Sequence, residues 1–362
     1  MRSTGYEMVA PGEPLRFIER DLAPPSEDEV LIEVAGCGLC HTDLGFLDDG
    51  VRTRHPLPLV LGHEISGFVR DAGSACADLV GRAVVVPAVL PCGTCADCLA
   101  GRTMICSHQV MPGNDRDGGF SSHVVLPGRH LTVVPEIEDA DQPLPGAGGA
   151  TLRHLAVLAD AASTPWQALV RADVQQDDLV VVVGLGGVGG FAVQLAAAVG
   201  AHVIGLDVDP AKLAAAEARG AGLVLDPAAQ PAKALRKQIK AWAQERGAPV
   251  RNWKIMECSG SARGQETAFG LLVHGAVLGV VGYTRDPVNV RLSNLMAFDA
   301  RAIGTWGCDP ALYADLVRMV LSGRLDLTPW TELRPLGRLP ETLDDVRAHR
   351  VSKRVVLTPE GS

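Results

Sequence analysis

The stretch VVVVGLGGVGG, residues 180–190, decides the fold of this chain of 362 residues. A run of valines enters a cluster of glycines, and an alanine-rich stretch that favours helix follows them. Gly184, Gly186 and Gly189 have the spacing G-x-G-x-x-G, which lets a strand turn sharply into a helix. In a strand–helix–strand unit, such a turn holds a pyrophosphate at the helix N-terminus.

The context of the glycines strengthens this interpretation. Asp207 ends the next expected strand, 21 residues beyond Gly186 (207 − 186), where a carboxylate accepts hydrogen bonds from an adenosine ribose. A carboxylate there repels a 2′-phosphate, so the sequence favours NAD over NADP. Lys212 either reaches the same ribose or is a solvated charge. The predicted cofactor-binding residues are Gly184, Gly186, Gly187, Val188, Gly189, Asp207 and Lys212, and a glycine-rich turn without a ligand is the alternative.

The pattern of strands and helices predicts the fold class α/β. From Thr164 to about Thr305, short apolar strands alternate with helical segments, which is typical of a doubly wound parallel sheet. One of these helices is expected to begin at Asp209 and Pro210 and to stop at Gly220. From Glu29 to about Pro135, short strands broken by Gly and Pro indicate a mainly β domain. Residues 136–154 form a Pro- and Gly-rich connection.

Composition excludes several classes of protein. The 33 basic and 42 acidic residues give a net charge of −9, and only 15 residues are aromatic (7 Phe, 5 Trp, 3 Tyr), which argues against a nucleic-acid partner. Residues 179–206 carry no charge and are long enough to span a membrane, but their seven glycines argue against a membrane helix. The first 20 residues have no apolar targeting segment, so we expect a cytoplasmic location.

Cysteines are grouped rather than paired. Four of the nine, Cys92, Cys95, Cys98 and Cys106, have the spacing C-x2-C-x2-C-x7-C, which suits metal ligation in a reducing compartment better than disulfides. Four thiolates close a tetrahedron around a structural zinc. An iron–sulfur cluster is the rival, because ferredoxin-type runs share the first spacings, but no proline follows Cys106.

A second set of metal donors comes from GCGLCHTD (36–43) and LGHE (61–64). Cys40, His63 and Glu64 offer sulfur, nitrogen and oxygen, a mixed set that leaves room for water or substrate on the metal. The alternative for each residue taken singly is packing in the core.

With these motifs in this order, the chain resembles the zinc-dependent medium-chain alcohol dehydrogenases from Val30 to Leu357. The resemblance implies a GroES-like catalytic zinc-binding domain, residues 1–163 and 306–362, and an inserted NAD-binding Rossmann domain, residues 164–305. It implies two zinc ions, with Cys40 and His63 as ligands of the catalytic one. In DAASTPWQA, Asp160 stands where many members have a cysteine as third ligand, so the resemblance implies that Asp160 is the third ligand of the catalytic zinc here; the alternative is a helix cap. A carboxylate gives the zinc less charge than a thiolate does.

The resemblance also implies roles around the zinc. Thr42 corresponds to the hydroxyl that passes the substrate's proton towards the cofactor ribose, Asp43 orients the histidine ligand, and Glu64 approaches the zinc during ligand exchange. Arg354 corresponds to a residue that reaches the pyrophosphate. Gly45 stands where the proton relay usually continues with a histidine. His41, Asp48 and His55 lie near it in sequence, but the sequence does not identify the terminal base. Homodimers or homotetramers are expected.

The substrate is a small molecule, and three segments suggest which. Residues 1–15, 163–169 and 282–307 resemble the dehydrogenases that oxidise 6-hydroxycyclohex-1-ene-1-carbonyl-CoA to its 6-oxo product in anaerobic aromatic degradation. An alicyclic CoA thioester needs a local cationic patch on this acidic protein. Candidates for that patch and for a ring pocket are Arg52, Arg54, His55, Arg291, Arg301, Trp166 and Trp306. The alternatives are another secondary alcohol or polyol, hydride transfer to the β-carbon of an enone or enoyl-CoA, and a non-catalytic relative of the fold.

Overall fold

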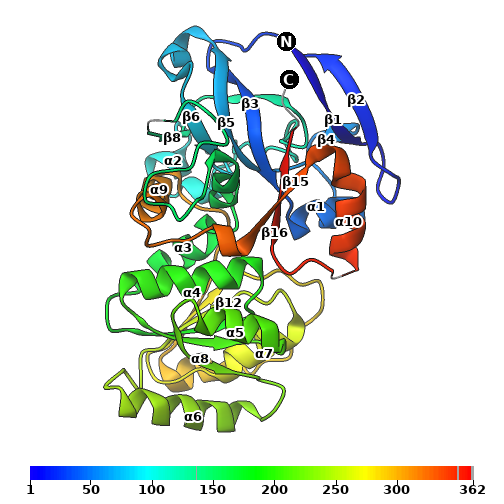
Figure 1. Cartoon of the computed structure of the whole chain (residues 1–362). Coiled ribbons are helices and arrows are strands. Elements are labelled where there is room, and N and C mark those ends of the chain that lie inside the picture. Colours follow the sequence, from blue (N-terminus) through cyan, green and yellow to red (C-terminus); the bar gives the residue numbers. More distant parts are fainter. Residues whose placement is uncertain (136, 349, 360–362) are drawn as a thin grey trace. The chain divides into compact units, whose positions relative to one another are not determined.

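The computed structural model of the protein describes residues 1–135, 137–348 and 350–359 (Figure 1). Residue 136, the first of the predicted connection 136–154, lies outside the described residues. The chain divides into two compact units, the first made of Met1–Ser163 and Gly307–Ser362 and the second of Thr164–Trp306. Each unit has its own sheet and its own hydrophobic core.

The second unit contains a six-stranded sheet in which every recorded pairing is parallel. Its order is β11 (Ala221–Leu225), β10 (His202–Leu206), β9 (Leu179–Val183), β12 (Lys254–Glu257), β13 (Val277–Val280) and β14 (Arg301–Gly304). All residues of β9 are buried, because a parallel strand is covered on both faces. The order reverses at β9, so the carboxyl ends of β9 and β12 form the ligand-binding edge of a doubly wound fold. The predicted α/β class is confirmed.

The helix α3 (Ser163–Arg171) precedes the first strand of this sheet, and the following helices connect its strands: α4 (Gly187–Val199), α5 (Pro210–Glu217), α6 (Ala232–Glu245), α7 (Ala262–Gly270) and α8 (Ser293–Phe298). Asp209 caps α5, since its carboxylate accepts a hydrogen bond from the Ala211 N–H at 2.9 Å. The helix ends at Glu217, three residues before the predicted stop at Gly220, which instead has a positive φ of 111° and turns the chain into β11.

The first unit is mainly β. Its larger sheet has the order β15 (Thr331–Pro335), β16 (Arg354–Thr358), β3 (Glu29–Gly38), β5 (Glu64–Ala72), β6 (Ala83–Val86) and β8 (Thr132–Val134), and β7 (His123–Pro127) also pairs with β3. A smaller sheet has the order β2 (Arg16–Asp21), β1 (Arg2–Met8) and β4 (Leu59–Val60). Buried aliphatic residues such as Ile32, Val69 and Leu126 form the core of this unit.

Short helices complete the first unit. The α-helices are α1 (His41–Leu47), α2 (Ala96–Leu99), α9 (Tyr313–Leu321) and α10 (Leu339–Arg347). The 3₁₀ helices are η1 (Ser74–Leu79), η2 (Thr103–Ile105), η3 (Leu152–Ala159), η4 (Pro310–Leu312), η5 (Thr328–Trp330) and η6 (Leu336–Arg338). These elements place side chains at the ends of the strands, where the metal donors described below lie.

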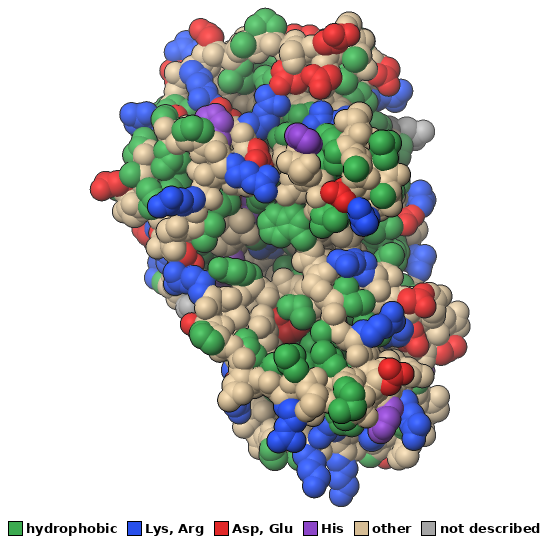
Figure 2. All heavy atoms as spheres, turned by 180° about the vertical axis from the view of Figure 1, so that it is seen from behind, with side chains coloured by type: hydrophobic (Ala, Val, Ile, Leu, Met, Phe, Trp, Pro, Cys, Tyr) green, Lys and Arg blue, Asp and Glu red, His purple; other side chains and the backbone are tan. Residues whose placement is uncertain are grey.

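The charge-free stretch 179–206 forms β9, α4 and β10 rather than one long helix. Across the described residues, no helix has both the length and the apolar character needed to cross a membrane. On the face drawn in Figure 2, Lys and Arg side chains gather at the lower end of the second unit, and elsewhere basic and acidic side chains are interspersed.

Glu29, at the start of β3, gives the fold a testable dependence on pH. Its carboxylate accepts hydrogen bonds from the Ser26 N–H at 3.0 Å and hydroxyl at 2.7 Å, and from Arg116 Nη2 at 2.6 Å. Burial by itself raises the pKa of Glu29, but the bonds from Ser26 and Arg116 lower it from 4.5 to about 2. Because the folded pKa lies below the unfolded one, this stabilisation is present above about pH 4.5 and is lost as the pH falls towards 2.

As the pH falls below 4.5, we therefore expect the free energy of unfolding of Glu29→Gln to decrease by about 1–2 kcal/mol less than that of the wild type, after allowing for solvent screening. Urea unfolding of wild type and variant between pH 5 and pH 3 measures this difference. Glu27→Gln, a change of the same chemistry two residues earlier, should leave the pH profile unchanged. Parallel profiles for wild type and Glu29→Gln would contradict the assignment.

Candidate active site and metal centres

Four metal-binding side chains from distant parts of the first unit converge at one point. Cys40 precedes α1 as its N-cap, His63 directly precedes β5, Glu64 is the first residue of β5, and Asp160 directly follows η3. The donor atoms of all four lie within 4.8 Å of one another. The structure thus brings together the candidate ligands of a catalytic metal.

The distances between the donor atoms fit a zinc ion. Asp160 Oδ2 lies 3.5 Å from Cys40 Sγ and 3.5 Å from His63 Nε2. Ligands about 2.0–2.3 Å from a tetrahedral zinc lie about 3.3–3.7 Å apart. Sulfur, nitrogen and oxygen donors therefore suit a zinc site in which three protein ligands leave one position for water or substrate.

Asp43 organises this site from behind. Its carboxylate accepts hydrogen bonds from the Cys40 N–H at 2.9 Å and from the Gly62 N–H at 3.2 Å, and it lies 3.5 Å from His63 Nδ1. Burial by itself lowers the pKa of His63, but Asp43 and Asp160 raise that pKa well above its usual range. Asp43 thus lies where a carboxylate can orient a histidine ligand.

Glu64 is held by Arg354, the first residue of β16. Arg354 Nε donates to Glu64 Oε2 at 3.1 Å, Nη2 donates to Oε1, and Nη2 also lies 3.7 Å from Asp160 Oδ2. Burial raises the pKa of Glu64, and the positive charge of Arg354 acts in the opposite direction. The sequence associates Arg354 with the pyrophosphate, whereas the structure places its guanidinium group on Glu64. The two residues are 290 positions apart, and no sequence pattern connects them.

The residues considered for proton transfer differ in their surroundings. The exposed Thr42 has its hydroxyl 3.6 Å from Cys40 Sγ. Asp48 accepts two hydrogen bonds of 2.8 Å from Arg347, and His55 Nδ1 lies 2.6 Å from the Pro56 carbonyl. Asp48 and His55 are therefore engaged by other groups, and both His41 and His55 are exposed; His41 also has an interaction partner.

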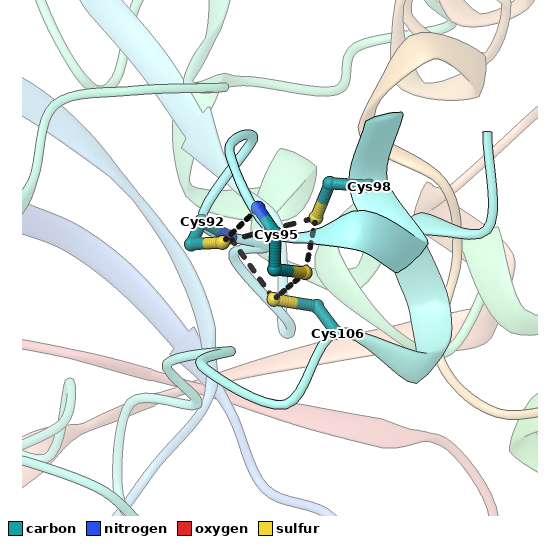
Figure 3. A group of neighbouring side chains, drawn as sticks. All are labelled: Cys92, Cys95, Cys98 and Cys106. Carbon is teal, nitrogen blue, oxygen red and sulfur yellow. Dashed lines mark hydrogen bonds between the residues drawn. The ribbon is translucent and has the colours of Figure 1, made fainter. Parts of the chain in front are cut away.

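The four-cysteine lobe, residues 92–106, forms a second centre (Figure 3). Cys95 Sγ lies 3.5 Å from Cys98 Sγ and 3.7 Å from Cys106 Sγ, and Cys92 Sγ lies 4.0 Å from Cys98 Sγ. Thiolates about 2.3 Å from a tetrahedral zinc lie about 3.8 Å apart. Hydrogen bonds from the Thr94 backbone and side chain are the main cause that lowers the pKa of Cys92 to about 5, which favours the thiolate.

All nine cysteines are free thiols. Cys37, Cys76 and Cys308 are buried, as expected for packing residues, and Cys258 is partly buried. The odd number of cysteines is therefore explained without a disulfide.

The glycine-rich turn has the shape expected of a dinucleotide site. Gly184 has φ +86°, and a Cβ atom on Gly189 would lie 1.8 Å from the Gly184 carbonyl oxygen, so both positions require glycine. A Cβ atom on Gly186 would meet no atom within 4 Å, which leaves an open cradle before α4. Asp207 accepts hydrogen bonds from the Leu185 N–H at 2.7 Å and the Asp209 N–H at 2.9 Å. Its carboxylate thus lies directly beside the turn.

One contributor to this turn was not predicted from the sequence. Ser259 follows β12, and a Cβ atom on Gly184 would lie 2.4 Å from its Cα atom. The Ser259 N–H and hydroxyl both bond to Glu257, a buried carboxylate at the end of β12. The neighbouring strand therefore supports the turn. Among the other predicted residues, Lys212 lies half-buried on α5, Trp166 is buried and Trp306 is 52% exposed.

Comparison with known proteins agrees with this geometry. Residues 26–136 match the family model described as the alcohol dehydrogenase GroES-like domain, and residues 187–322 match the one described as zinc-binding dehydrogenase. The chain is 25% identical over 346 residues to an alcohol dehydrogenase of Geobacillus stearothermophilus, covering 95% of this chain and 96% of the relative. It is 28% identical over 344 residues to L-galactonate-5-dehydrogenase of Escherichia coli, covering 94% of each.

A solved structure is similar over almost the whole chain. Galactitol-1-phosphate dehydrogenase from Escherichia coli superposes with a TM-score of 0.84 at 25% identity, covering 98% of this chain and 100% of that one. Metal donors, a dinucleotide turn and these matches define a zinc-dependent oxidoreductase. The chain belongs to the zinc-dependent medium-chain alcohol dehydrogenase family, and its residues fit two zinc ions and a nicotinamide dinucleotide.

We expect Asp160→Ala to lower the zinc content from two ions per chain to about one, because it would remove one of three candidate ligands while the four-cysteine lobe stays intact. Elemental analysis of the purified protein measures the zinc content. Asp141→Ala removes an exposed carboxylate from the same unit and should retain both ions. A variant Asp160→Ala that keeps two zinc ions would rule out Asp160 as a ligand.

Proposed function

We propose that this protein oxidises a secondary alcohol to a ketone with NAD, at a zinc ion held by Cys40, His63 and Asp160. The observation that carries the proposal is the 3.5 Å separation of Asp160 Oδ2 from both Cys40 Sγ and His63 Nε2. When bound there, zinc acts as a Lewis acid that makes the hydroxyl proton of the alcohol easier to remove. The catalytic role is assigned to the first unit and the binding of NAD to the second.

The protein's own residues then divide the remaining tasks. The exposed Thr42 hydroxyl, beside Cys40, accepts the carbinol proton and passes it towards the cofactor ribose and water. The hydride leaves the carbinol carbon for the nicotinamide ring, so the products are a ketone, NADH and a proton. Asp43 holds His63 in orientation, and Glu64 is the carboxylate available for ligand exchange. Arg354 is assigned to the neighbourhood of the pyrophosphate with less structural support, since it pairs with Glu64.

Asp207 supports the choice of NAD over NADP. Its carboxylate lies beside the glycine turn, bonded to the Leu185 N–H, where a 2′-phosphate would meet a negative charge. Lys212 on α5 is a second candidate for the ribose. The grouping of four cysteines at metal-ligand spacing, rather than in disulfide pairs, supports a cytoplasmic location. The sheet edge at β14, with three of its four residues exposed, supports a homodimer or homotetramer.

We expect Asp207→Asn to reduce kcat/KM for NAD about tenfold and to narrow the preference for NAD over NADP, because an amide no longer repels the 2′-phosphate. Steady-state kinetics with both cofactors measure the ratio. Asp209→Asn removes the same charge two residues later and should leave the ratio unchanged, since asparagine also caps helices. An unchanged ratio in Asp207→Asn would overturn the cofactor assignment.

For the substrate, we propose a narrower candidate within this class, the alicyclic thioester 6-hydroxycyclohex-1-ene-1-carbonyl-CoA. The resemblance of segments 1–15, 163–169 and 282–307 supports it. The basic residues considered for binding the CoA phosphates give this substrate less support. One of them, Arg54, already pairs through Nη1 with Asp115 Oδ1 at 3.3 Å, and the protein as a whole is acidic. The relatives described above are named for an alcohol and for sugar derivatives, which favours the broader class of secondary alcohols and polyols.

A panel of substrates separates these candidates by the absorbance of NADH. We expect NAD reduction with secondary alcohols, and the narrower candidate requires the hydroxyenoyl-CoA to exceed simple alcohols and polyols in kcat/KM by at least about 100-fold, roughly 2.7 kcal/mol. Comparable turnover of a polyol would exclude the thioester as the preferred substrate. Reduction of a conjugated ketone with deuterated NADH shows which carbon receives the deuterium. Deuterium at the carbonyl carbon indicates alcohol dehydrogenase chemistry, and deuterium at the β-carbon indicates hydride transfer to an enone.

A further inference from the structure

The carbonyl group that precedes Asp160 is held by three buried donors. The Ala159 carbonyl oxygen lies 2.6 Å from the Tyr313 hydroxyl, 3.0 Å from the Ser163 hydroxyl and 3.3 Å from the Ala88 N–H. The two hydroxyls also lie 3.2 Å from each other. This peptide group is therefore anchored to two distant segments of the first unit, at Ala88 and Tyr313, and locally to Ser163, four residues further on.

The peptide group after Asp160 is held as well. The Ala161 N–H donates to Glu64 Oε1 at 3.2 Å. Asp160 itself has φ −140° and ψ −59°, outside the helical range, because η3 ends at Ala159. No regular backbone hydrogen bonding of the helix therefore dictates where its side chain points. The hydrogen bonds on both sides instead restrain the backbone from which this side chain projects.

Tyr313 and Ser163 are suited to this role by their burial. Tyr313 is 1% exposed and Ser163 is 0% exposed, and both hydroxyls reach the same carbonyl oxygen. A buried hydroxyl is costly unless it is hydrogen-bonded, and a phenylalanine would fill the same space. The phenol oxygen at position 313 thus has a specific partner, the backbone beside Asp160.

The segment that carries Tyr313 is itself connected to the four-cysteine lobe. The Thr103 hydroxyl donates to Asp309 Oδ2 at 3.0 Å. Asp309 caps η4 by accepting from the Ala311 N–H at 3.0 Å, and η4 leads directly into α9, which begins at Tyr313. The segment from Asp309 to Tyr313 is therefore supported at one end by the four-cysteine lobe and contacts the backbone beside Asp160 at the other.

We propose that Tyr313, together with Ser163, is a positioning residue for Asp160. By holding the Ala159 carbonyl, the two hydroxyls keep the Asp160 carboxylate 3.5 Å from Cys40 Sγ and His63 Nε2, the separation that a shared zinc ion requires. The inference rests on the proposed function, in which Asp160 is a zinc ligand. Neither hydroxyl touches the donor atoms, so both act through the backbone.

The test compares the holoenzyme with Tyr313→Phe, Ser163→Ala and a control, Thr342→Val. The control also deletes a buried hydroxyl that donates to a carbonyl: the Thr342 hydroxyl, on α10, donates to the Arg338 carbonyl oxygen at 2.7 Å. Competition with a chromophoric chelator measures the affinity of each zinc ion, and the visible spectrum of the cobalt-substituted enzyme reports the ligand geometry at Cys40.

We expect Tyr313→Phe and Ser163→Ala to weaken the catalytic zinc about tenfold and to shift the cobalt spectrum, as loss of supporting hydrogen bonds does at other metal sites. The zinc of the four-cysteine lobe and the control should not change. Wild-type affinity and spectrum in both variants, or equal weakening of both zinc ions, would overturn the inference. If Tyr313→Phe does not fold, Ser163→Ala decides alone.

The same measurement distinguishes this inference from the proposed function. A wild-type protein that binds only the zinc of the four-cysteine lobe would contradict the catalytic site itself. A wild type with two zinc ions, beside variants that keep both affinities, would contradict only the role of Tyr313 and Ser163.

Discussion

The buried ion pair between Arg354 and Glu64 is the interaction on which the catalytic region depends. It joins the last strand of the first unit, β16, to β5, and the same guanidinium group lies 3.7 Å from Asp160. Both side chains are almost completely buried, at 7% and 0% exposure. Because an isolated charge inside a protein is costly, each of them needs the other. The ion pair thus joins the N-terminal and C-terminal segments of the first unit next to the candidate metal ligands.

The close packing around this pair restricts the neighbouring backbone. A Cβ atom on Gly38 would lie 1.8 Å from Glu64 Oε2, so the strand before Cys40 must carry a glycine there. The Asp43 carboxylate accepts hydrogen bonds from the backbone N–H groups of Cys40 and Gly62. These bonds restrain the two loops that carry the sulfur and nitrogen donors. These contacts restrain the candidate metal ligands from behind, as is typical of preorganised sites.

Features that depend on short spacings were predictable. The four cysteines lie within fifteen residues, and the glycines of the dinucleotide turn within six, so local backbone geometry alone brings them together. Alternation of strands and helices predicted the parallel sheet for the same reason. The end of α5 was less predictable, because Gly220 forms the turn into β11 rather than the helix cap. The Arg354 partner could not be predicted, since it is 290 residues away.

By itself the sequence determined the fold class, the four-cysteine lobe, the dinucleotide turn and the residue types of the catalytic donors. These follow from periodicity and from ligand spacing, which are properties of neighbouring residues. Only the tertiary structure gave the 3.5 Å distances from Asp160 to Cys40 and His63, and it alone decided that Arg354 pairs with Glu64 and that Tyr313 anchors the backbone beside Asp160. The physical reason is that these contacts join residues far apart in the chain, from 97 positions (160 − 63) to 290, and their meeting depends on how the strands of the first unit pair.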